Sequence, residues 1–260
     1  MIKKKIKMNN LKDKKVGLAL GGGAVLGAVH VGVLKAFEEF EVDIKAISGT
    51  SAGAIVAALY AFGKSAEEIE KIVIEFEWKK LSSLTLSKYG LLSNEKIGEI
   101  IKHNIGDKEF KDANIPLEMI ATDITTGDKI ILNKGRVADA VIASTCIPGI
   151  FIPVEIEGRF LVDGGVVENV PLSCLKNKDI DFTIGVDLVP ERSYKKPENV
   201  IEVLYNSFNF LVKANKKNQI KDADIIIKPD LSAFNAVDMS QIKDLIQIGY
   251  DETKKIIKNL

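Results

Sequence analysis

The chain has 260 residues, 46% of them hydrophobic and 28% charged, a composition typical of a globular protein rather than a disordered one. Its 36 basic and 36 acidic side chains give a net charge of zero, which argues against a nucleic-acid partner. The two cysteines, Cys146 and Cys174, form no C-x-x-C pair. We therefore expect a reducing, cytoplasmic location and no metal or disulfide framework.

The chain starts with a lysine-rich stretch, but no apolar segment of the signal-peptide type follows it. We expect residues 1–14 to form a flexible basic arm and residues 15–260 to form a single domain. A weak contact between the arm and an anionic membrane surface, peripheral to the membrane, is the alternative for this segment. The oligomeric state cannot be read from the sequence.

Residues 16–34 form a run in which His30 is the only ionisable side chain, long enough to suggest a membrane-spanning helix. The run contains six glycines, three of them consecutive at 21–23. These glycines instead favour a buried strand over 16–20, a loop, and a helix over about 24–40. His30 then lies among valines inside this helix, where a buried core histidine is expected.

A second strand is expected over residues 44–48, followed by a sharp turn and an alanine-rich helix. Ser65 and Glu68 have the spacing of a capping box, which predicts a helix to about Trp78. The apolar stretch from Leu81 to Leu92 has no periodicity and is typical of a lid or binding loop. A loop folded onto the core would have the same composition.

The rest of the chain continues the alternation of strands and helices. We expect a helix over 93–103 capped by Ser93, strands over 117–124 and 129–132, a helix over 137–144, two short strands between 151 and 162, a short helix over 171–175, a strand over 182–189, a long helix over 200–220, a strand over 223–228, and a helix capped by Ser240 to about Asn259. This order predicts a three-layer α/β/α domain with a mostly parallel central sheet.

The turn after the second strand reads Gly49-Thr50-Ser51-Ala52-Gly53 and matches the G-x-S-x-G pattern of a nucleophile elbow. Such an elbow holds a serine hydroxyl away from the sheet, and the glycines permit close backbone approach. The following helix directs its positive end at the serine oxygen. A serine that merely caps a buried helix would give the same pattern.

A serine nucleophile needs a base within hydrogen-bond reach. No histidine follows His103, which excludes the Ser, Asp, His order of the α/β-hydrolases, and His103 itself reads as a surface residue. Asp163 is the candidate base because it ends an apolar strand and precedes Gly164 and Gly165, so its carboxylate can face a cleft. An ordinary Asp-Gly turn is the structural alternative.

The glycine run 21–23 lies between a strand and a helix, where consecutive N–H groups can bind an anion. In acyl transfer that anion is the tetrahedral oxyanion. In a nucleotide enzyme it would be a pyrophosphate. Gly21, Gly23 and Gly27 approximate a dinucleotide fingerprint with the third glycine one position late, and Asp43 lies about where a ribose-binding acid is expected.

Taken together, these motifs resemble the patatin-like phospholipases over about residues 16–189. The family works with a Ser-Asp dyad and no histidine. The resemblance implies that the nucleophile is Ser51, the base is Asp163, the oxyanion hole is formed by the amides of Gly21, Gly22 and Gly23, and the supporting glycines are Gly49, Gly53, Gly164 and Gly165. It also implies a lipid or phospholipid ester substrate, no cofactor and no metal.

Two further blocks, Ala121-Thr122-Asp123 and Ala143-Ser144, also resemble family blocks around the cleft, with Asp123 expected as a structural partner rather than a second base. One position departs from the family pattern. Leu26 stands where family members commonly carry Arg or Lys, which puts the headgroup preference in doubt. A nucleotide-binding oxidoreductase and a non-catalytic lipid-binding protein remain as alternatives.

Overall fold

The structure, a computed structural model, describes residues 11–75, 83–84, 89–189 and 196–260. Most of the expected basic arm, most of the expected lid and the expected helix end at Trp78 lie outside these residues. Residues 11–13 form a 3-10 turn, η1 (Leu11–Asp13), and the Leu11 side chain is buried. The described residues of the expected arm are therefore structured rather than flexible.

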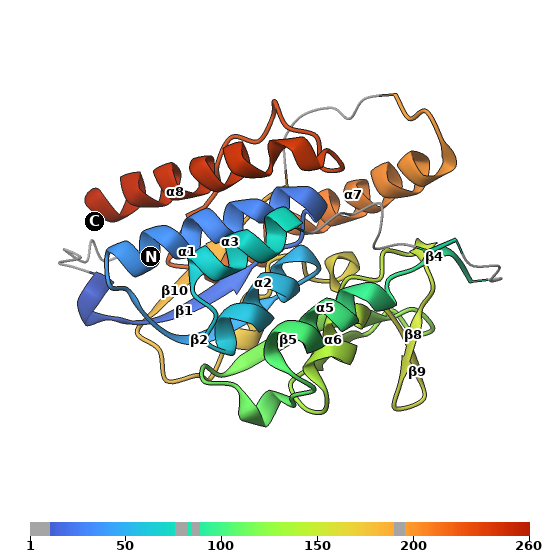
Figure 1. Ribbon diagram of the computed structural model, residues 1–260, viewed down its shortest axis with the longest axis horizontal. Helices are drawn as coiled ribbons and strands as arrows, with labels where there is room; N and C mark the ends of the chain where they lie inside the picture. The colour runs from blue at the N-terminus through green and yellow to red at the C-terminus, as the bar shows by residue number, and fades with distance from the viewer. Residues whose placement is uncertain (1–10, 76–82, 85–88, 190–195) are drawn as a thin grey trace.

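Eight strands of the described chain form the central sheet, in the order β11-β10-β1-β2-β5-β9-β8, with β6 also paired to β5 (Figure 1). Their bounds are β1 Lys15–Leu20, β2 Asp43–Gly49, β5 Leu117–Asp123, β6 Lys129–Leu132, β8 Val154–Ile156, β9 Arg159–Asp163, β10 Phe182–Val186 and β11 Ile225–Ile227. The pairings from β11 through β5 are parallel, whereas β6 and β9 run antiparallel to β5 and β8 runs antiparallel to β9. The mostly parallel sheet predicted from the sequence is confirmed.

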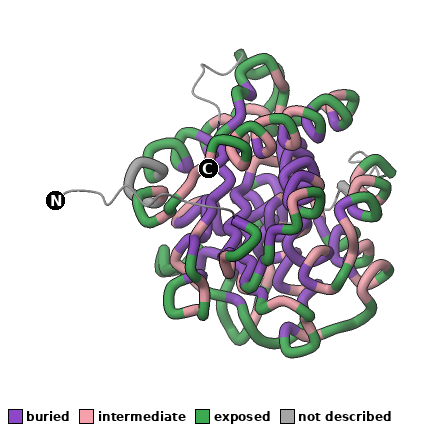
Figure 2. The backbone as a smooth tube through the Cα atoms, turned by 90° about the vertical axis from the view of Figure 1, so that its left-hand side faces the viewer, coloured by how far each residue is buried: buried purple, intermediate pink, exposed green. Residues whose placement is uncertain are grey.

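Helices cover both faces of this sheet, giving three layers. One face is covered by η2 (Ala24–Ala28), α1 (Val29–Glu39), α2 (Ala52–Ala61), α3 (Ala66–Glu75), α5 (Glu95–Ile105), α6 (Val137–Ser144) and α8 (Ile242–Lys258). The other face is covered by η5 (Leu172–Leu175) and η6 (Ile220–Asp222), whereas α7 (Val200–Gln219) packs in a separate cluster with residues 146–151. Buried residues concentrate in the strands and on the inner sides of the helices (Figure 2).

The β1 sequence shows why the two faces differ. Val16, Leu18 and Leu20 alternate with Gly17 and Ala19, and all five are buried because parallel strands are covered on both sides. The large side chains enter the main helical core, whereas Ala19 packs in a smaller cluster with η5. Small residues on that face let the short 3-10 segment lie close to the sheet.

A small second sheet corrects the expected irregular loop. It consists of β3 (Ser83–Leu84), β4 (Gly90–Ser93) and β7 (Gly149–Phe151), so part of the 81–92 stretch is extended rather than irregular. β7 also adds a third strand to the two expected between 151 and 162. The apolar stretch has no helical period because its described parts pair as strands.

The predicted helix caps are partly correct. Ser65 and Glu68 form the expected capping box, with the Ser65 hydroxyl accepting Glu68 N–H at 3.2 Å and the Glu68 carboxylate accepting Ser65 N–H at 2.9 Å. The other two predictions are wrong. Ser93 belongs to β4 and Asn94 precedes α5, while Ser240 lies within η7 (Met239–Gln241), whose cap is Asp238.

The glycine-rich run at 16–34 divides into β1, η2 and α1, as the three consecutive glycines predict. His30 is fully buried in α1, as expected for a core histidine, and His103 is exposed. Within the described part of the chain, no helix is both long and apolar enough to cross a membrane.

Candidate active site

The strand register places Ser51 and Asp163 level with each other. Gly49 at the end of β2 pairs with Met119 of β5, and two residues later on β5 Ala121 pairs with Asp163. Ser51 also lies two residues beyond Gly49, so it reaches the same level along the strand direction as Asp163. The sheet thus brings together two residues that are 112 positions apart in the sequence (163 − 51).

Ser51 occupies the strained turn that a nucleophile elbow requires. Its backbone has φ 54° and ψ −126°, in a region that L-residues rarely adopt, and α2 begins at the next residue. Gly53 permits this tight turn, because a Cβ at that position would lie 2.1 Å from the carbonyl oxygen of Leu20. The elbow geometry predicted from the G-x-S-x-G pattern is confirmed.

Two hydroxyl groups hold the elbow in place. Ser51 N–H donates to the Ser144 hydroxyl at 3.1 Å, and that hydroxyl donates to the Ile120 carbonyl oxygen at 2.7 Å. The Thr50 hydroxyl donates to the Glu168 carbonyl oxygen at 3.1 Å. The serine backbone is therefore fixed to β5 on one side and to the segment after Asp163 on the other.

Asp163 is fully buried rather than open to a cleft, which corrects the sequence-based picture. β9 runs antiparallel to β5, so its last residue lies inside the sheet instead of at the outer edge. Oδ1 accepts the Gly165 N–H at 2.8 Å, and the Asp163 backbone is held by Cys146 and Thr122. Oδ2 is buried and has no hydrogen-bond partner among the described residues.

Burial raises the pKa of Asp163 from 3.8 to about 7, because the charged carboxylate has lost its hydration. The neighbouring Ser51 hydroxyl and the Gly165 N–H act in the opposite direction and keep the pKa from rising further. Ser51 is thus close enough to act on the carboxylate, although its hydroxyl is not yet hydrogen-bonded to Oδ2. A carboxylate with this pKa can take up and release a proton near neutral pH.

The glycine loop is only partly available as an oxyanion hole. Gly21 N–H donates to the Val186 carbonyl oxygen at 3.1 Å, and Gly22 N–H donates to the Asn169 carbonyl oxygen at 3.3 Å. The expectation that all three glycine amides face an anion is therefore wrong for Gly21 and weakened for Gly22. The N–H groups of Gly23 and Ala52 have no acceptor among the described residues, and each of these residues lines a cavity that Ser51 also lines.

Two side chains that the sequence reasoning missed hold this loop. Asn169 donates its amide N–H to the Gly22 carbonyl oxygen at 3.3 Å. His30 Nε2 lies 2.7 Å from the Gly21 carbonyl oxygen, and burial lowers the pKa of His30 to about 4, so the ring is neutral and Nε2 carries the proton. Gly22 itself must be small, because a Cβ there would lie 2.8 Å from the Ser51 Cβ.

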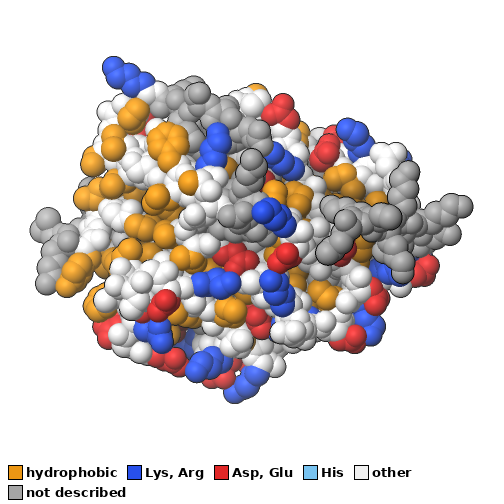
Figure 3. All heavy atoms as spheres, turned by 180° about the vertical axis from the view of Figure 1, so that it is seen from behind, with side chains coloured by type: hydrophobic (Ala, Val, Ile, Leu, Met, Phe, Trp, Pro, Cys, Tyr) orange, Lys and Arg blue, Asp and Glu red, His pale blue; other side chains and the backbone are white. Residues whose placement is uncertain are grey.

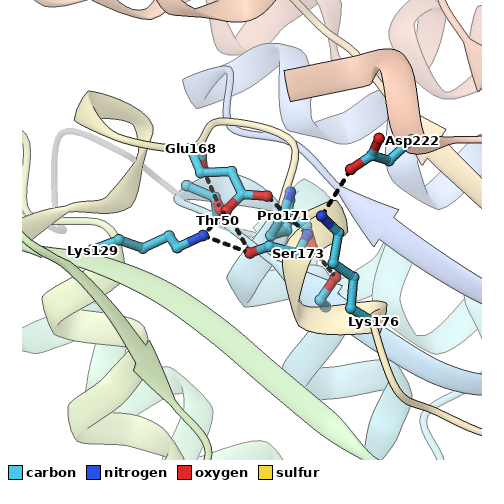
Figure 4. Close-up of polar contacts among 8 residues, drawn as sticks. Thr50, Lys129, Glu168, Pro171, Ser173, Lys176 and Asp222 are labelled. Atoms are coloured by element: carbon cyan, nitrogen blue, oxygen red, sulfur yellow. Dashed lines mark hydrogen bonds and ion pairs between the residues drawn. The ribbon is translucent and has the colours of Figure 1, made fainter. Parts of the chain in front are cut away.

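A network of hydrogen bonds and an ion pair surrounds Glu168, which contacts the elbow at Thr50 (Figure 4). The Glu168 carboxylate accepts from Ser173 N–H at 2.9 Å and from the Ser173 hydroxyl at 2.6 Å, and it pairs with Lys129 Nζ at 2.9 Å. Its main-chain oxygen is the one that accepts from Thr50. The network therefore links β6, η5 and the elbow through one residue.

Two cavities meet at Ser51. The apolar cavity, of about 70 Å³, is lined by Ser51 with Val25, Ile55, Ile72, Ile97 and Ile242 among other apolar residues. The mixed cavity, of about 300 Å³, is lined by Ser51 with Gly23, Lys196, Glu202, Phe208 and Asn209 among others. A serine between an apolar and a polar space suits an ester with one apolar and one polar part.

The remaining predicted residues also have clear positions. Leu26 is buried and lines the mixed cavity, where the family pattern would place a cation. Asp123 is buried, and its carboxylate accepts the Thr125 N–H at 2.9 Å in the turn after β5, a structural role. No group of three or more His, Cys, Asp or Glu side chains in the described chain could hold a metal ion.

The ribose-binding role considered for Asp43 is wrong. Asp43 starts β2 and pairs with Lys15 at the start of β1, whereas Gly21 follows the end of β1. The two ends of a six-residue strand are about 20 Å apart. Asp43 therefore lies at the opposite end of the sheet from the glycine loop and cannot contact a nucleotide bound there.

The chain is similar to proteins of one known family. The family model described as Patatin-like phospholipase matches residues 18–175. An uncharacterized NTE family protein of Mycobacterium tuberculosis is 32% identical over 185 residues, which cover 70% of this chain and 51% of the relative. The lysophospholipase NTE1 of Kluyveromyces lactis is 26% identical over 272 residues, covering 92% of this chain and 19% of the relative.

Among solved structures, VipD from Legionella pneumophila has the same fold, with a TM-score of 0.65 and 13% sequence identity. The superposition covers 95% of this chain and 67% of VipD. The chain spans about half the length of the mycobacterial relative it matches and a smaller share of the yeast one.

Proposed function

The chain belongs to the patatin-like phospholipase family, and from that premise we propose that it is a lipid acyl hydrolase that cleaves carboxylic esters with Ser51 and Asp163. The observation that carries this proposal is the position of Ser51. Its strained elbow lies where the two cavities meet, beside a buried carboxylate whose pKa is raised to about 7. We also propose that residues 15–260 act as one catalytic domain.

In the proposed reaction, Ser51 Oγ attacks the ester carbonyl carbon while Asp163 Oδ2 accepts the hydroxyl proton. The unpartnered Oδ2 is the atom available for this step. The tetrahedral oxyanion accepts hydrogen bonds from the N–H groups of Gly23 and Ala52. Each such donor lowers the barrier by roughly 3 kcal/mol in enzymes of this kind.

Collapse of the tetrahedral intermediate breaks the ester C–O bond, and Asp163 returns its proton to the departing alcohol oxygen. Water then attacks the acyl-enzyme and Asp163 accepts a proton from it; in the second collapse the bond from the acyl carbon to Ser51 Oγ breaks, Asp163 returns the proton to Oγ, and the carboxylic acid is released. We assign the acyl chain to the apolar cavity and the alcohol part to the mixed cavity. The lysophospholipase activity in the name of the yeast relative supports a lipid ester as substrate.

The test compares wild type with Ser51→Ala and Asp163→Asn in two assays, fatty-acid release from phospholipid and lysophospholipid micelles, and hydrolysis of a dissolved short-chain ester. Both variants should lose at least about a thousandfold in kcat. Asp123→Asn is the matched control, because it alters a nearby buried carboxylate that the mechanism does not use. Circular dichroism confirms equal folding. Full activity in Ser51→Ala would refute the proposal.

A further inference from the structure

The outward side of α7 is apolar and exposed. Val200, Val203, Phe210 and Leu211 expose 60%, 48%, 56% and 54% of their surface, and we call these four residues the outer face of α7. Their spacing of three, seven and one places them on one side of a helix. Exposed apolar patches of this kind mark interaction sites in soluble domains.

The inward side of the same helix is also apolar and belongs to the active site. Tyr205, Phe208 and Val212 line the mixed cavity that reaches Ser51. A helix with side chains is about 10 Å across, so whatever covers the outer face lies one helix diameter from the cavity. The helix therefore separates the substrate cavity from the surface to which its outer face binds.

The segment that carries this face is basic, although the whole chain is neutral. Residues 196–221 contain five lysines and two glutamates, a net charge of +3 (5 − 2), in a chain whose net charge is zero. Lys196 lines the mixed cavity, and three of the other lysines fall between residues 213 and 217. An apolar helix face flanked by lysines is the pattern of a helix that lies on an anionic lipid surface.

Neighbouring elements extend the apolar surface. α7 packs beside β7, where Gly149 lies against the Leu204 side chain, and in the same small sheet Leu91 of β4 (38%) and Tyr89 just before β4 (51%) are exposed. Seen from behind, hydrophobic side chains gather on the left half of the molecule, the side on which α7 and β4 lie (Figure 3). The patch thus covers more than one helix.

We propose that the outer face of α7 docks on an anionic membrane surface and so brings the mixed cavity to its lipid. The proposal rests on the proposed function, since it takes the lipid as the substrate of Ser51. The excess of lysines favours a membrane over a second copy of this chain, because two copies of a basic segment would repel each other.

The test measures co-sedimentation of the full chain with vesicles of phosphatidylcholine, with and without phosphatidylglycerol. Wild type should bind the anionic vesicles, and added salt should weaken binding. Phe210→Gln/Leu211→Gln, which keeps helix propensity, should reduce the vesicle partition coefficient at least about tenfold. Ile131→Gln on β6, which replaces a residue 40% exposed, should change it by less than about twofold.

A second readout separates this proposal from the catalytic one. The α7 double variant should hydrolyse a dissolved short-chain ester at the wild-type rate, because neither residue lines the apolar or the mixed cavity at Ser51. Ser51→Ala should lose that hydrolysis yet bind vesicles normally. Equal vesicle binding by wild type and the double variant would overturn the docking proposal. The docking proposal would also be overturned if wild type did not bind the vesicles. The same holds if wild type formed a concentration-dependent dimer that the double variant did not form.

Discussion

Ser144 holds Ser51 by its backbone: its hydroxyl accepts the Ser51 N–H at 3.1 Å and donates onward to the Ile120 carbonyl oxygen at 2.7 Å. Both groups are buried, so water cannot replace the bond. An elbow residue in a rare backbone conformation persists only where its surroundings fix it. Ser144 is therefore a positioning residue for the proposed nucleophile, although it touches no substrate.

Replacing Ser144 with Ala should lower both stability and turnover. The buried Ser51 N–H and Ile120 carbonyl each lose a partner, which costs about 1–3 kcal/mol of unfolding free energy. Ser48→Ala is the matched control, because Ser48 is equally buried and its hydroxyl donates to the Pro171 carbonyl oxygen at 2.9 Å. Urea unfolding should show losses in both variants, whereas kcat for a short-chain ester should fall only in Ser144→Ala. Equal kcat losses would contradict the positioning role.

The pH dependence of the reaction should follow Asp163. Its pKa of about 7 means that the carboxylate is mostly protonated, and unable to accept the Ser51 proton, at acidic pH. We expect kcat/KM for a dissolved ester to rise about tenfold per pH unit below about pH 6 and to level off above about pH 8. Stopped or continuous assays in constant-ionic-strength buffers would measure this profile. A profile with no change across that interval would exclude Asp163 as the base.

The same carboxylate should make the fold less stable as the pH rises. Asp163 keeps its proton in the folded chain until about pH 7 but loses it near its ordinary value of 3.8 when unfolded. Between these two pH values the folded state therefore binds more protons than the unfolded state. The contribution of Asp163 to the free energy of unfolding is lost as the pH rises through about 7. Relative to Asp163→Asn, wild type should lose about 4 kcal/mol from about pH 4 to about pH 8. Urea unfolding of both proteins across this interval measures the difference.

His30 should act in the opposite sense. Burial lowers the pKa of His30 to about 4 in the folded chain, whereas its ordinary value is 6.5. Between these two pH values the unfolded chain therefore binds a proton that the folded chain does not bind. The contribution of His30 to the free energy of unfolding is complete above about pH 6.5. It falls by at most about 3 kcal/mol as the pH drops toward 4. Nuclear magnetic resonance of the ring should show a neutral His30 at pH 6. A charged ring at that pH would contradict the lowered pKa of His30.

Local sequence patterns predicted the parts of the site that local structure determines. G-x-S-x-G predicted the elbow, because the turn needs glycines within two residues of the serine, and Ser51 has a positive φ in that turn. The glycine run predicted the break between β1 and the helix after it. Alternating strands and helices predicted the layers and the parallel sheet.

The parts that the sequence could not reveal depend on distant pairings. Ser144 lies 93 positions from Ser51, and Asn169 lies 147 positions from Gly22, so no local pattern joins them. The burial of Asp163 follows from the antiparallel pairing of β9 with β5. The Gly21 N–H is engaged because β10 pairs with β1, a neighbour relation that the chain order hides.

The last prediction concerns the ion pair behind the elbow. Glu168 is almost fully buried, while the Lys129 side chain is 37% exposed, so the pair is only partly screened by water. Glu168→Gln and Lys129→Met should each reduce the unfolding free energy by about 1–2 kcal/mol, with a coupling of about 1 kcal/mol in the double variant. Neither change removes the Glu168 main-chain oxygen that accepts from Thr50.

Measurements of kcat should therefore distinguish the role of the Glu168 side chain from that of its main-chain oxygen. Thr50→Val keeps the shape of the side chain but removes the hydroxyl that ties the elbow to Glu168, so kcat for a dissolved ester should fall several-fold. Glu168→Gln should retain most of the wild-type kcat at a temperature where it is fully folded. Strict additivity of the two stability losses would show that Lys129 and Glu168 act independently. A kcat loss in Glu168→Gln as large as in Thr50→Val would instead mean that the carboxylate, through Ser173 and η5, sets the position of the backbone oxygen.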